Sequence, residues 1–329
     1  MSFSKVQRYI VLMSKQGFHN LDPELVLKAT ELAGFQPTGE FTQLNSYENR
    51  VFDIRTEDEL QPRVIAKFYR PNRWSGECIL EEHAFLQELA DEGIPAVTAL
   101  TQKNSSTLNS FEEMYVAFFP KVLGRMPVEF LGNDLLSVGR RIAQMHNVGA
   151  KHDFSYRPVI AEHPWTPWET LDYLSEWVSP EVWSRYEKAA ETVIESLNSK
   201  VNPDEFIRIH GDCHRGNLLT NDKEFFFVDF DDTCMGPAVQ DFWMLFSSLE
   251  SQKEQELLIQ GYEEFREFPY HQLNWIDELR GLRILSYAGW IARRWTDPSF
   301  PKIFPDFNSF SYWAEETEAL EKIVRNIEK

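Results

Sequence analysis

A single stretch, about two-thirds of the way along the chain, constrains the fold more than any other. Residues 207–219 read Ile-Arg-Ile-His-Gly-Asp-Cys-His-Arg-Gly-Asn-Leu-Leu, and the apolar run 225–228 that follows them ends in an aspartate, Asp229. The hydrophobic flanks predict buried strands, and the polar middle predicts the loop between them. A loop held by two strands would present Asp212, Asn217 and Asp229 together.

The spacing of these three side chains is typical of one kind of chemistry. Asn217 follows Asp212 by five residues, and Asp229 comes after the next predicted strand. Protein kinases place a catalytic aspartate, an asparagine and a metal-binding aspartate in this order. The loop must turn far enough for the base to face a substrate hydroxyl while the amide oxygen faces a metal ion. The spacing therefore predicts phosphoryl transfer.

The match to protein kinases is partial. Their His-Arg-Asp is replaced here by His-Gly-Asp at 210–212, and their Asp-Phe-Gly is replaced by Asp-Phe-Asp-Asp at 229–232. The His-Gly-Asp triplet, followed by a second histidine at His214, resembles the aminoglycoside phosphotransferase and choline kinase branch of the kinase-like fold.

Five segments narrow this resemblance. They are Leu-Asn-Ser-Tyr-Glu-Asn-Arg-Val at 44–51, Ala-Lys-Phe-Tyr-Arg-Pro at 66–71, His-Gly-Asp-Cys-His at 210–214, Gly-Pro-Ala-Val-Gln-Asp at 236–241 and Arg-Arg-Trp at 293–295. Together they resemble the bacterial stress response kinase A family, which is described as serine/threonine protein kinases with the small-molecule-kinase fold. Because the segments run from residue 44 to about residue 300, the resemblance covers most of the chain.

The resemblance implies an α+β, protein-kinase-like fold of two lobes, of the aminoglycoside phosphotransferase/choline kinase type. Residues 1–119 would form an N-terminal lobe, an antiparallel sheet plus one helix, that binds the ATP phosphates. Residues 120–329 would form a mostly helical C-terminal lobe that carries the catalytic and metal-binding loops. A chain of 329 residues is long enough for one large domain or two modest ones.

Apolar periodicity places the elements of the N-terminal lobe. We expect a helix from residue 22 to about residue 34, strands at 44–54 and 63–69, a helix at 79–90 and a strand at 114–120. The turn at 45–49 stands where a protein kinase has a glycine-rich loop, yet it contains no glycine. Asparagine and serine can still form tight turns and donate hydrogen bonds. Ser46 is therefore our candidate for covering the phosphates, and an ordinary hairpin turn is the alternative.

Lys67 ends a Val-Ile-Ala-Lys run that closely matches the Val-Ala-Ile-Lys strand of protein kinases. A lysine in an apolar strand costs desolvation free energy unless a partner lies near. The α- and β-phosphates of ATP and a helix glutamate would be such partners. Glu82 borders the buried stripe of the helix at 79–90 and is our candidate for the ion pair, with Glu81 as the rival. The alternatives are an edge-strand lysine that extends to solvent and a solvated glutamate.

Helices are also expected along the C-terminal lobe, at 134–148, 172–177, 181–198, 238–249, 255–265, 276–295 and 312–327. Residues 152–168 predict a loop because they are rich in proline and aromatic residues, and 300–305 interrupts the helical pattern. The family resemblance makes His146 a packing residue and Asp241 a buttress of the catalytic loop.

Composition limits the partners and the location. The net charge of −19 argues against nucleic-acid and anionic-membrane surfaces, which need basic patches, but not against ATP, whose site needs only a few local cations and a metal. Cys78, Cys213 and Cys234 are scattered and odd in number, so no disulfide framework or zinc knuckle is predicted. The apolar run at 9–13 lacks a cleavage site, and no run approaches the ~18 apolar residues that span a bilayer. We expect a cytoplasmic protein and a monomer, with residues 1–20 forming either a short tail or an added helix.

Two other chemistries compete for the central stretch. His210, Asp212 and His214 alternate as metal ligands do in an extended segment, which would suit Zn or Fe in a metallohydrolase. That interpretation leaves Asn217 without a role, and no further histidine-rich cluster completes the site. Cys213 beside the histidines would be a thiol nucleophile, but adjacent side chains of a strand point to opposite faces, so the pairing geometry is poor.

We therefore expect a kinase that binds ATP in the cleft between its lobes and works mostly by positioning and charge neutralisation. Lys67 would hold the phosphates and Glu82 would orient it. Asn217 and Asp229 would bind Mg²⁺. Asp212 would orient the acceptor hydroxyl and accept its proton.

The resemblance implies that the acceptor is a serine or threonine hydroxyl of a protein, the enzyme's own chains included. A small-molecule kinase acting on an amino alcohol or aminoglycoside is the alternative, because the acidic pair Asp231 and Asp232 would suit a cationic substrate. Either member of that pair would otherwise bind a second metal or cap the following turn. A pseudokinase or binding module is a third class, and the presence of Lys67, Asp212 and Asp229 argues against it.

Overall fold

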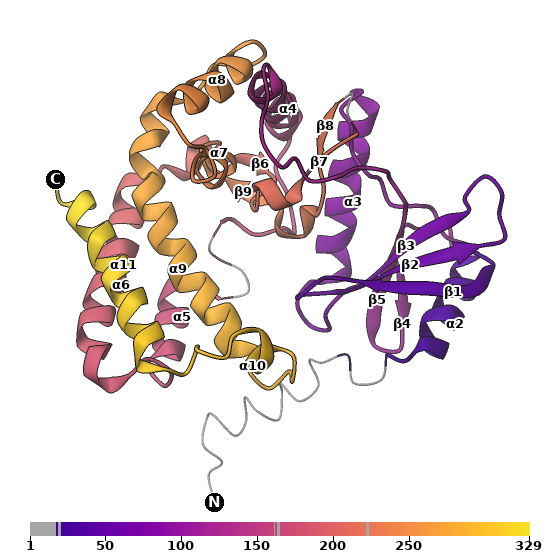
Figure 1. The fold of residues 1–329 in the computed structure, drawn as a ribbon, viewed down its shortest axis with the longest axis horizontal. Coiled ribbons are helices and arrows are strands. Elements are labelled where there is room, and N and C mark those ends of the chain that lie inside the picture. Colours follow the sequence, from indigo (N-terminus) through magenta and orange to yellow (C-terminus); the bar gives the residue numbers. More distant parts are fainter. Residues whose placement is uncertain (1–17, 19–20, 161, 163–164, 222–223) are drawn as a thin grey trace, which may run out of the picture.

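The computed structural model describes residues 18, 21–160, 162, 165–221 and 224–329. A five-stranded antiparallel sheet with two helices lies at one end of the molecule, and helices make up most of the other end (Figure 1). Short strands that carry the central stretch lie between these two parts. The predicted tail or helix at 1–20 lies outside the described residues, apart from Phe18.

The sheet has the strand order β1-β2-β3-β5-β4. Its strands are β1 (Pro37–Leu44), β2 (Arg50–Thr56), β3 (Arg63–Phe68), β4 (Asn109–Phe111) and β5 (Met114–Pro120). Helix α2 (Pro23–Ala33) precedes it, as expected: the Asp22 side chain caps its first turn, and it ends at Gly34. Gly34 has φ 104°, a left-handed conformation that glycine adopts without strain.

The strand predicted at 44–54 needs a correction. The turn expected at 45–49 is present, but it joins two strands, because β1 runs from Pro37 to Leu44 and β2 begins at Arg50. Within β1 only Pro37 and Phe41 are even partly buried. The strand therefore carries no apolar alternation from which it could be predicted.

Lys67 lies on a central strand of the sheet. In β3 it stands opposite Val51 of β2 and Ala117 of β5. The edge-strand alternative for this lysine is therefore wrong. Its apolar neighbours along the strand, Val64 and Ala66, are fully buried in the core of the lobe.

Helix α3 (Gly76–Asp91) joins the sheet to the helical part. Its first residue, Gly76, follows the N-cap Ser75 and lies three residues before the predicted start at 79. Phe85 and Leu89 of α3 belong to the same core cluster as residues of the helical part, such as Ile142. The predicted lobe boundary between residues 119 and 120 falls at the end of β5 and stays a prediction.

The helical part contains α4 (Asp134–Gly149), α5 (Pro167–Leu174), α6 (Pro180–Lys200), α7 (Gln240–Phe246), α8 (Gln252–Glu263), α9 (Ile276–Arg293), α10 (Phe300–Ile303) and α11 (Phe310–Ile327). The start of α5 differs from the predicted residue 172, because Thr166 and Glu169 form a capping box that begins the helix at Pro167. Helices α6, α9 and α11 pack around the buried Tyr186 and Trp313.

Four short strands hold the central stretch. β6 (Ile207–Ile209) pairs with β9 (Cys234–Gly236), and β7 (Leu218–Thr220) pairs with β8 (Phe225–Phe227). The predicted strands on either side of the polar loop are therefore confirmed. Gly211 has φ 84°, and a Cβ atom there would lie 2.2 Å from the carbonyl oxygen of Asp232. This close approach explains why glycine stands where protein kinases have arginine.

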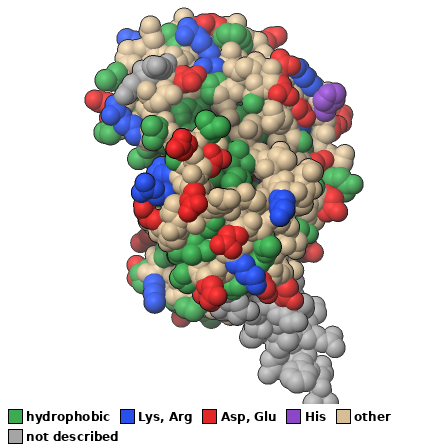
Figure 2. Space-filling view, turned by 90° about the vertical axis from the view of Figure 1, so that its right-hand side faces the viewer, with side chains coloured by type: hydrophobic (Ala, Val, Ile, Leu, Met, Phe, Trp, Pro, Cys, Tyr) green, Lys and Arg blue, Asp and Glu red, His purple; other side chains and the backbone are tan. Residues whose placement is uncertain are grey.

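Charged side chains of both signs are mixed on one face of the molecule. On the face that Figure 2 shows, basic side chains stand singly or in small groups among acidic ones. Among the described residues, no helix combines the length and the apolar character needed to cross a membrane.

Candidate active site

The side chain of Asp241, on α7, holds the loop after β6 by two hydrogen bonds. Its Oδ2 accepts a hydrogen bond from the backbone N–H of His210 at 2.8 Å, and its Oδ1 accepts one from the N–H of Gly211 at 2.9 Å. His146 is fully buried and lies 3.1 Å from Asp241 Oδ2 and 3.0 Å from the Tyr262 hydroxyl. Asp241 therefore occupies the expected buttress position. His146 was expected only to pack in the core. It also connects Asp241 to Tyr262 of α8 through its two ring nitrogens.

The two oxygens of Asp212 have different environments. Oδ2 lies 3.3 Å from Nδ2 of Asn217 and 3.4 Å from Nε2 of His214, whereas Oδ1 lies 2.9 Å from Nη1 of Arg283 on α9. Burial alone would raise the pKa of Asp212. The hydrogen bond from His214 and the charge of Arg283 outweigh it and hold this pKa well below its usual value.

The loop also brings Asn217 to Asp229. The N–H of Val228 donates to the backbone carbonyl of Asn217 at 2.9 Å, so the residue after Val228 emerges beside the loop. Asp229 itself is in the left-handed region, with φ 62°, and its side chain is 58% exposed. The surrounding protein and the carboxylates of Asp231 and Glu82 raise its pKa.

Lys67 contacts three carboxylates. Its Nζ lies 2.8 Å from Asp231 Oδ1, 3.5 Å from Glu82 Oε1 and 3.7 Å from Asp229 Oδ1, and its side chain is 10% exposed. Burial lowers the pKa of this lysine, but the carboxylates, Asp231 first, raise it well above its usual value. The predicted pairing with Glu82 is present in the structure, although Asp231 lies closer.

The two candidate glutamates of α3 have separate partners. Glu82 is buried between Lys67 and Arg157, whose Nη2 lies 2.7 Å from its Oε2. Glu81 instead accepts the backbone N–H groups of residues 155–157, at 2.6–2.8 Å. Glu81 therefore holds the loop before α5, and the rival assignment to Lys67 is wrong.

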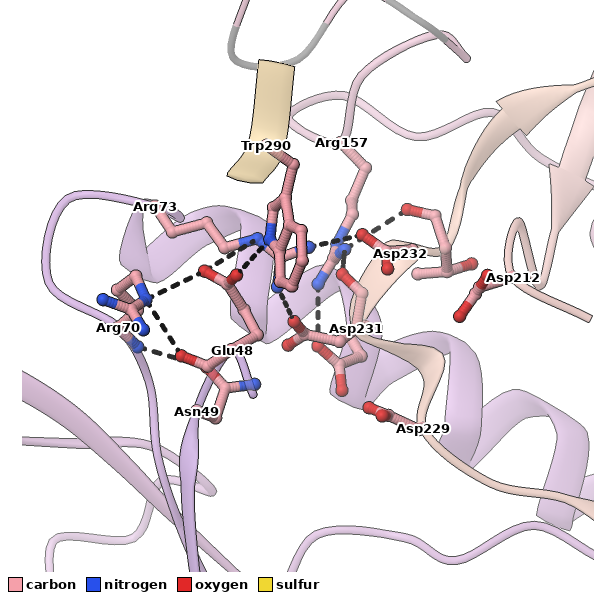
Figure 3. Close-up of polar contacts among 12 residues, drawn as sticks. Glu48, Asn49, Arg70, Arg73, Arg157, Asp212, Asp229, Asp231, Asp232 and Trp290 are labelled. Atoms are coloured by element: carbon pink, nitrogen blue, oxygen red, sulfur yellow. Dashed lines mark hydrogen bonds and ion pairs between the residues drawn. The ribbon is translucent and has the colours of Figure 1, made fainter. Parts of the chain in front are cut away.

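Two arginines of the site were missed from the sequence. Arg73, after β3, is ion-paired with both Asp231 and Asp232 (Figure 3). Arg157 donates to the carbonyl oxygen of Asp231 at 2.6 Å as well as to Glu82. Asp231 and Asp232, for which we left open a second metal or a turn cap, are therefore engaged by cations. No spacing rule links residues so far apart, and only their charge offered a signal.

The turn between β1 and β2 is tied to α9. Glu48 Oε2 accepts from the indole N–H of Trp290 at 2.6 Å, and its Oε1 accepts from Arg294 at 2.7 Å (Figure 3). Arg70 also contacts Glu48, at 3.2 Å. Burial opposes ionisation, but these cations lower the pKa of Glu48 to about 2. Ser46, in the same turn, accepts a hydrogen bond from the N–H of Asn49 at 3.3 Å.

The competing chemistries find little support. His210 is buried and its Nε2 lies 3.0 Å from the carbonyl oxygen of Val228, so it does not point out with His214. Within residues 18, 21–160, 162, 165–221 and 224–329, no three or more His, Cys, Asp and Glu side chains are grouped to hold a metal ion by themselves. Cys213 is fully buried, and burial raises the pKa of its thiol well above the usual value. A protonated thiol is a poor nucleophile.

Comparison with known proteins identifies the family of this chain. Residues 40–276 match the family described as "Phosphotransferase enzyme family". Stress response kinase A of Escherichia coli (strain K12) is 37% identical over 304 residues, which cover 91% of this chain and 92% of that protein. A Salmonella typhimurium (strain LT2) protein named serine/threonine protein kinase RdoA is 37% identical over 305 residues, with the same coverage of 91% and 92%.

Solved structures share the fold at low sequence identity. Amicoumacin kinase hAmiN, in complex with AMP-PNP, Ca²⁺ and Ami, has a TM-score of 0.73 at 20% identity and covers 94% of this chain and 93% of its own. The microcompartment-associated aminopropanol kinase has a TM-score of 0.71 at 19% identity and covers 94% of this chain and 99% of its own.

Fold and site together define a kinase-type phosphotransferase with the aminoglycoside phosphotransferase/choline kinase-like fold, which confirms the predicted fold class. Within that class, the chain belongs to the stress response kinase A family.

Proposed function

We propose that this chain is an ATP-dependent serine/threonine protein kinase. One observation carries the proposal: the strand lysine and the central loop meet. Lys67 lies 3.7 Å from Asp229, and Asp229 emerges beside the loop that carries Asp212 and Asn217. These are the residue types that kinases use to hold phosphates, bind metal and position a hydroxyl.

The nucleotide would lie between two lobes, residues 1–119 and residues 120–329. Lys67 would bind the α- and β-phosphates, and Glu82, 3.5 Å away, would keep its ammonium group in place. Ser46 would cover the phosphates from a turn whose Glu48 accepts hydrogen bonds from Trp290 and Arg294.

Asn217 and Asp229 fit a magnesium ion by the chemistry of their donor atoms. Asn217 uses its amide nitrogen on Asp212, which leaves the amide oxygen for a cation, and Asp229 supplies a carboxylate. Hard oxygen ligands suit Mg²⁺, which usually takes one or two protein carboxylates together with water and substrate phosphates. When bound, the ion would neutralise charge on the phosphates.

In the transfer step, the acceptor oxygen forms a bond to the γ-phosphorus while the bond from that phosphorus to the bridging oxygen of ADP breaks. Asp212 would orient the hydroxyl and receive its proton, and ADP would leave. Because the neighbours of Asp212 hold its pKa low, it is a weak base. Its main contribution is therefore orientation, and the proton would move late.

A small-molecule acceptor is the second candidate, since two kinases that share the fold are named for amicoumacin and aminopropanol. Asp231 and Asp232 would attract a cationic amine if they were free. In the structure Arg73 is ion-paired with both, and Lys67 is ion-paired with Asp231 as well. The name of the Salmonella relative also favours a protein acceptor.

The test is to incubate the enzyme with γ-labelled ATP, mixed protein substrates and a panel of hydroxylated amines. We expect acid-stable label on protein, the enzyme's own chain included, and its loss in Asp229→Ala. The exposed Asp172→Asn on α5 is the matched control and should label normally. Label on an amine alone, with protein unlabelled at equal turnover, would show that the small-molecule candidate is the right one.

A further inference from the structure

One oxygen of the Asp212 carboxylate is held by neighbours and the other is covered. Oδ2 contacts Asn217 and His214. Oδ1 is buried and meets no hydrogen-bond donor of suitable geometry among the described residues, yet it lies 2.9 Å from Nη1 of Arg283. Within that part of the chain, Oδ1 is therefore the oxygen of Asp212 without a hydrogen-bond partner, and the guanidinium lies over it. A group that orients a hydroxyl or takes its proton must lie within hydrogen-bond reach of it, and Oδ1 is the oxygen with this capacity unused.

Arg283 is able to uncover it. Its side chain is 40% exposed, whereas that of Asp212 is 18% exposed. A pair with one partner this open to water is weak, because solvent screens the attraction and the long side chain gains freedom on leaving. The guanidinium can thus swing away when another anion competes for it.

The surroundings of Arg283 would suit an extended polar chain. Tyr287, one helical turn further along α9, is 42% exposed, and Tyr47 of the β1–β2 turn is 58% exposed. Burial raises the pKa of Tyr287, the charge of Arg283 lowers it, and Tyr47 and Glu316 raise it further. Tyrosines present large, rigid and amphipathic surfaces at a small entropic cost.

A basic side chain stands at this point of an otherwise acidic molecule. The net charge is −19, but the guanidinium of Arg283 lies 2.9 Å from Asp212 Oδ1 and the imidazole of His214 lies 3.4 Å from Oδ2. The nearby carboxylate of Asp232 is paired with Arg73. A cationic group on the acceptor would therefore face Arg283 at the point of reaction, and like charges brought together disfavour binding.

We propose that Arg283 is both a gate over Asp212 and the residue that selects the acceptor. An anionic group beside the acceptor hydroxyl draws the guanidinium off Oδ1, and the hydroxyl takes its place. This inference rests on the proposed function and makes the preferred acceptor a serine or threonine flanked by acidic side chains. While no acceptor is bound, the closed gate keeps water from Oδ1 and so limits wasteful ATP hydrolysis.

The experiment compares two serine peptides that differ only in having aspartate or lysine beside the serine. We expect the wild-type enzyme to prefer the acidic peptide by about tenfold in kcat/KM, a usual effect of charge matching. Arg283→Glu should reverse the preference, and Arg283→Gln should abolish it. Arg280→Gln is the matched control: it lies on the same helix, is 53% exposed and pairs with Asp277, and it should keep the wild-type preference.

A second measurement does not depend on the peptide. Arg283→Gln should raise acceptor-free ATP hydrolysis several-fold, while Arg280→Gln leaves it unchanged, with melting curves showing that both variants are folded. An unchanged hydrolysis rate in Arg283→Gln overturns the gate. A wild-type enzyme without charge preference, or Arg283→Glu without reversal, overturns the selection.

Failure of the proposed function gives a different pattern. If label reaches only small alcohols, the protein-kinase assignment fails, and the comparison is repeated with glycerate and ethanolamine as anionic and cationic acceptors. Preference for glycerate that Arg283→Glu removes supports the inference. Preference for ethanolamine overturns it.

Discussion

Asp212 is the residue whose replacement should cost the most activity for the least structural change. Asp212→Asn keeps the shape of the side chain and removes the oxygen that would accept the hydroxyl proton. We expect kcat to fall by roughly 10²–10⁴, the usual range for a lost general base, with ATP binding largely kept. Initial-rate kinetics with a nucleotide-binding assay measure both quantities. A purified Asp212→Asn sample with full activity would contradict the assignment.

Sequence reasoning can identify site residues when they lie a few positions apart in a known spacing. Asp212, Asn217 and Asp229 lie within one turn-and-strand unit, and the structure brings them together. Arg73 could not be found in this way, because 158 residues separate it from Asp231. The pairing forms only because the fold brings the segment after β3 against the segment after β8. A short sequence pattern cannot show which distant segments will meet.

Among the elements, helices with a clear apolar stripe were predicted well, because a period of 3.6 residues survives in the sequence wherever one face is buried. α2, α3 and α11 are examples. β1 was missed because it is exposed along most of its length, and the start of α5 was misplaced because its capping box, not its apolar pattern, sets the boundary.

The docking of the β1–β2 turn on α9 yields a prediction of its own. Trp290→Phe removes the indole N–H that lies 2.6 Å from Glu48 but keeps an aromatic ring to stack on Tyr287. A hydrogen bond to a charged group contributes about 1.5–3 kcal/mol. We expect faster amide hydrogen exchange at 45–49. If half of that free energy orders the turn, the KM for ATP should rise by about four- to tenfold.

The matched control for this prediction is Trp183→Phe on α6, where the ring stacks on Tyr186 and the indole is remote from the turn. It should leave both the exchange rates at 45–49 and the KM for ATP unchanged. Equal exchange in Trp290→Phe and wild type would mean that α9 does not order the turn.

At the scale of the whole molecule, ion pairs join the sheet part to the helical part. Arg73 bridges to Asp231 and Asp232, and Glu48 is held by Arg294. The family resemblance predicted two parts and a site between them. It did not predict the ion pairs that connect the two parts, because each pair depends on packing that forms only in the complete fold.

Metal and nucleotide should therefore act on the stability of the entire chain. A ligand present at 100 times its dissociation constant stabilises the folded state by about 2.7 kcal/mol. With roughly 2–4 °C per kcal/mol for domains of 150–250 residues, AMP-PNP with Mg²⁺ should raise Tm by several degrees. EDTA should remove most of that rise, and Mg²⁺ or Mn²⁺ should restore both the rise and phosphoryl transfer.

The Asp229→Ala variant should lose the metal-dependent part of the rise in Tm, and the control variant Asp172→Asn should keep it. Activity restored by Zn²⁺ alone would instead favour the metallohydrolase interpretation.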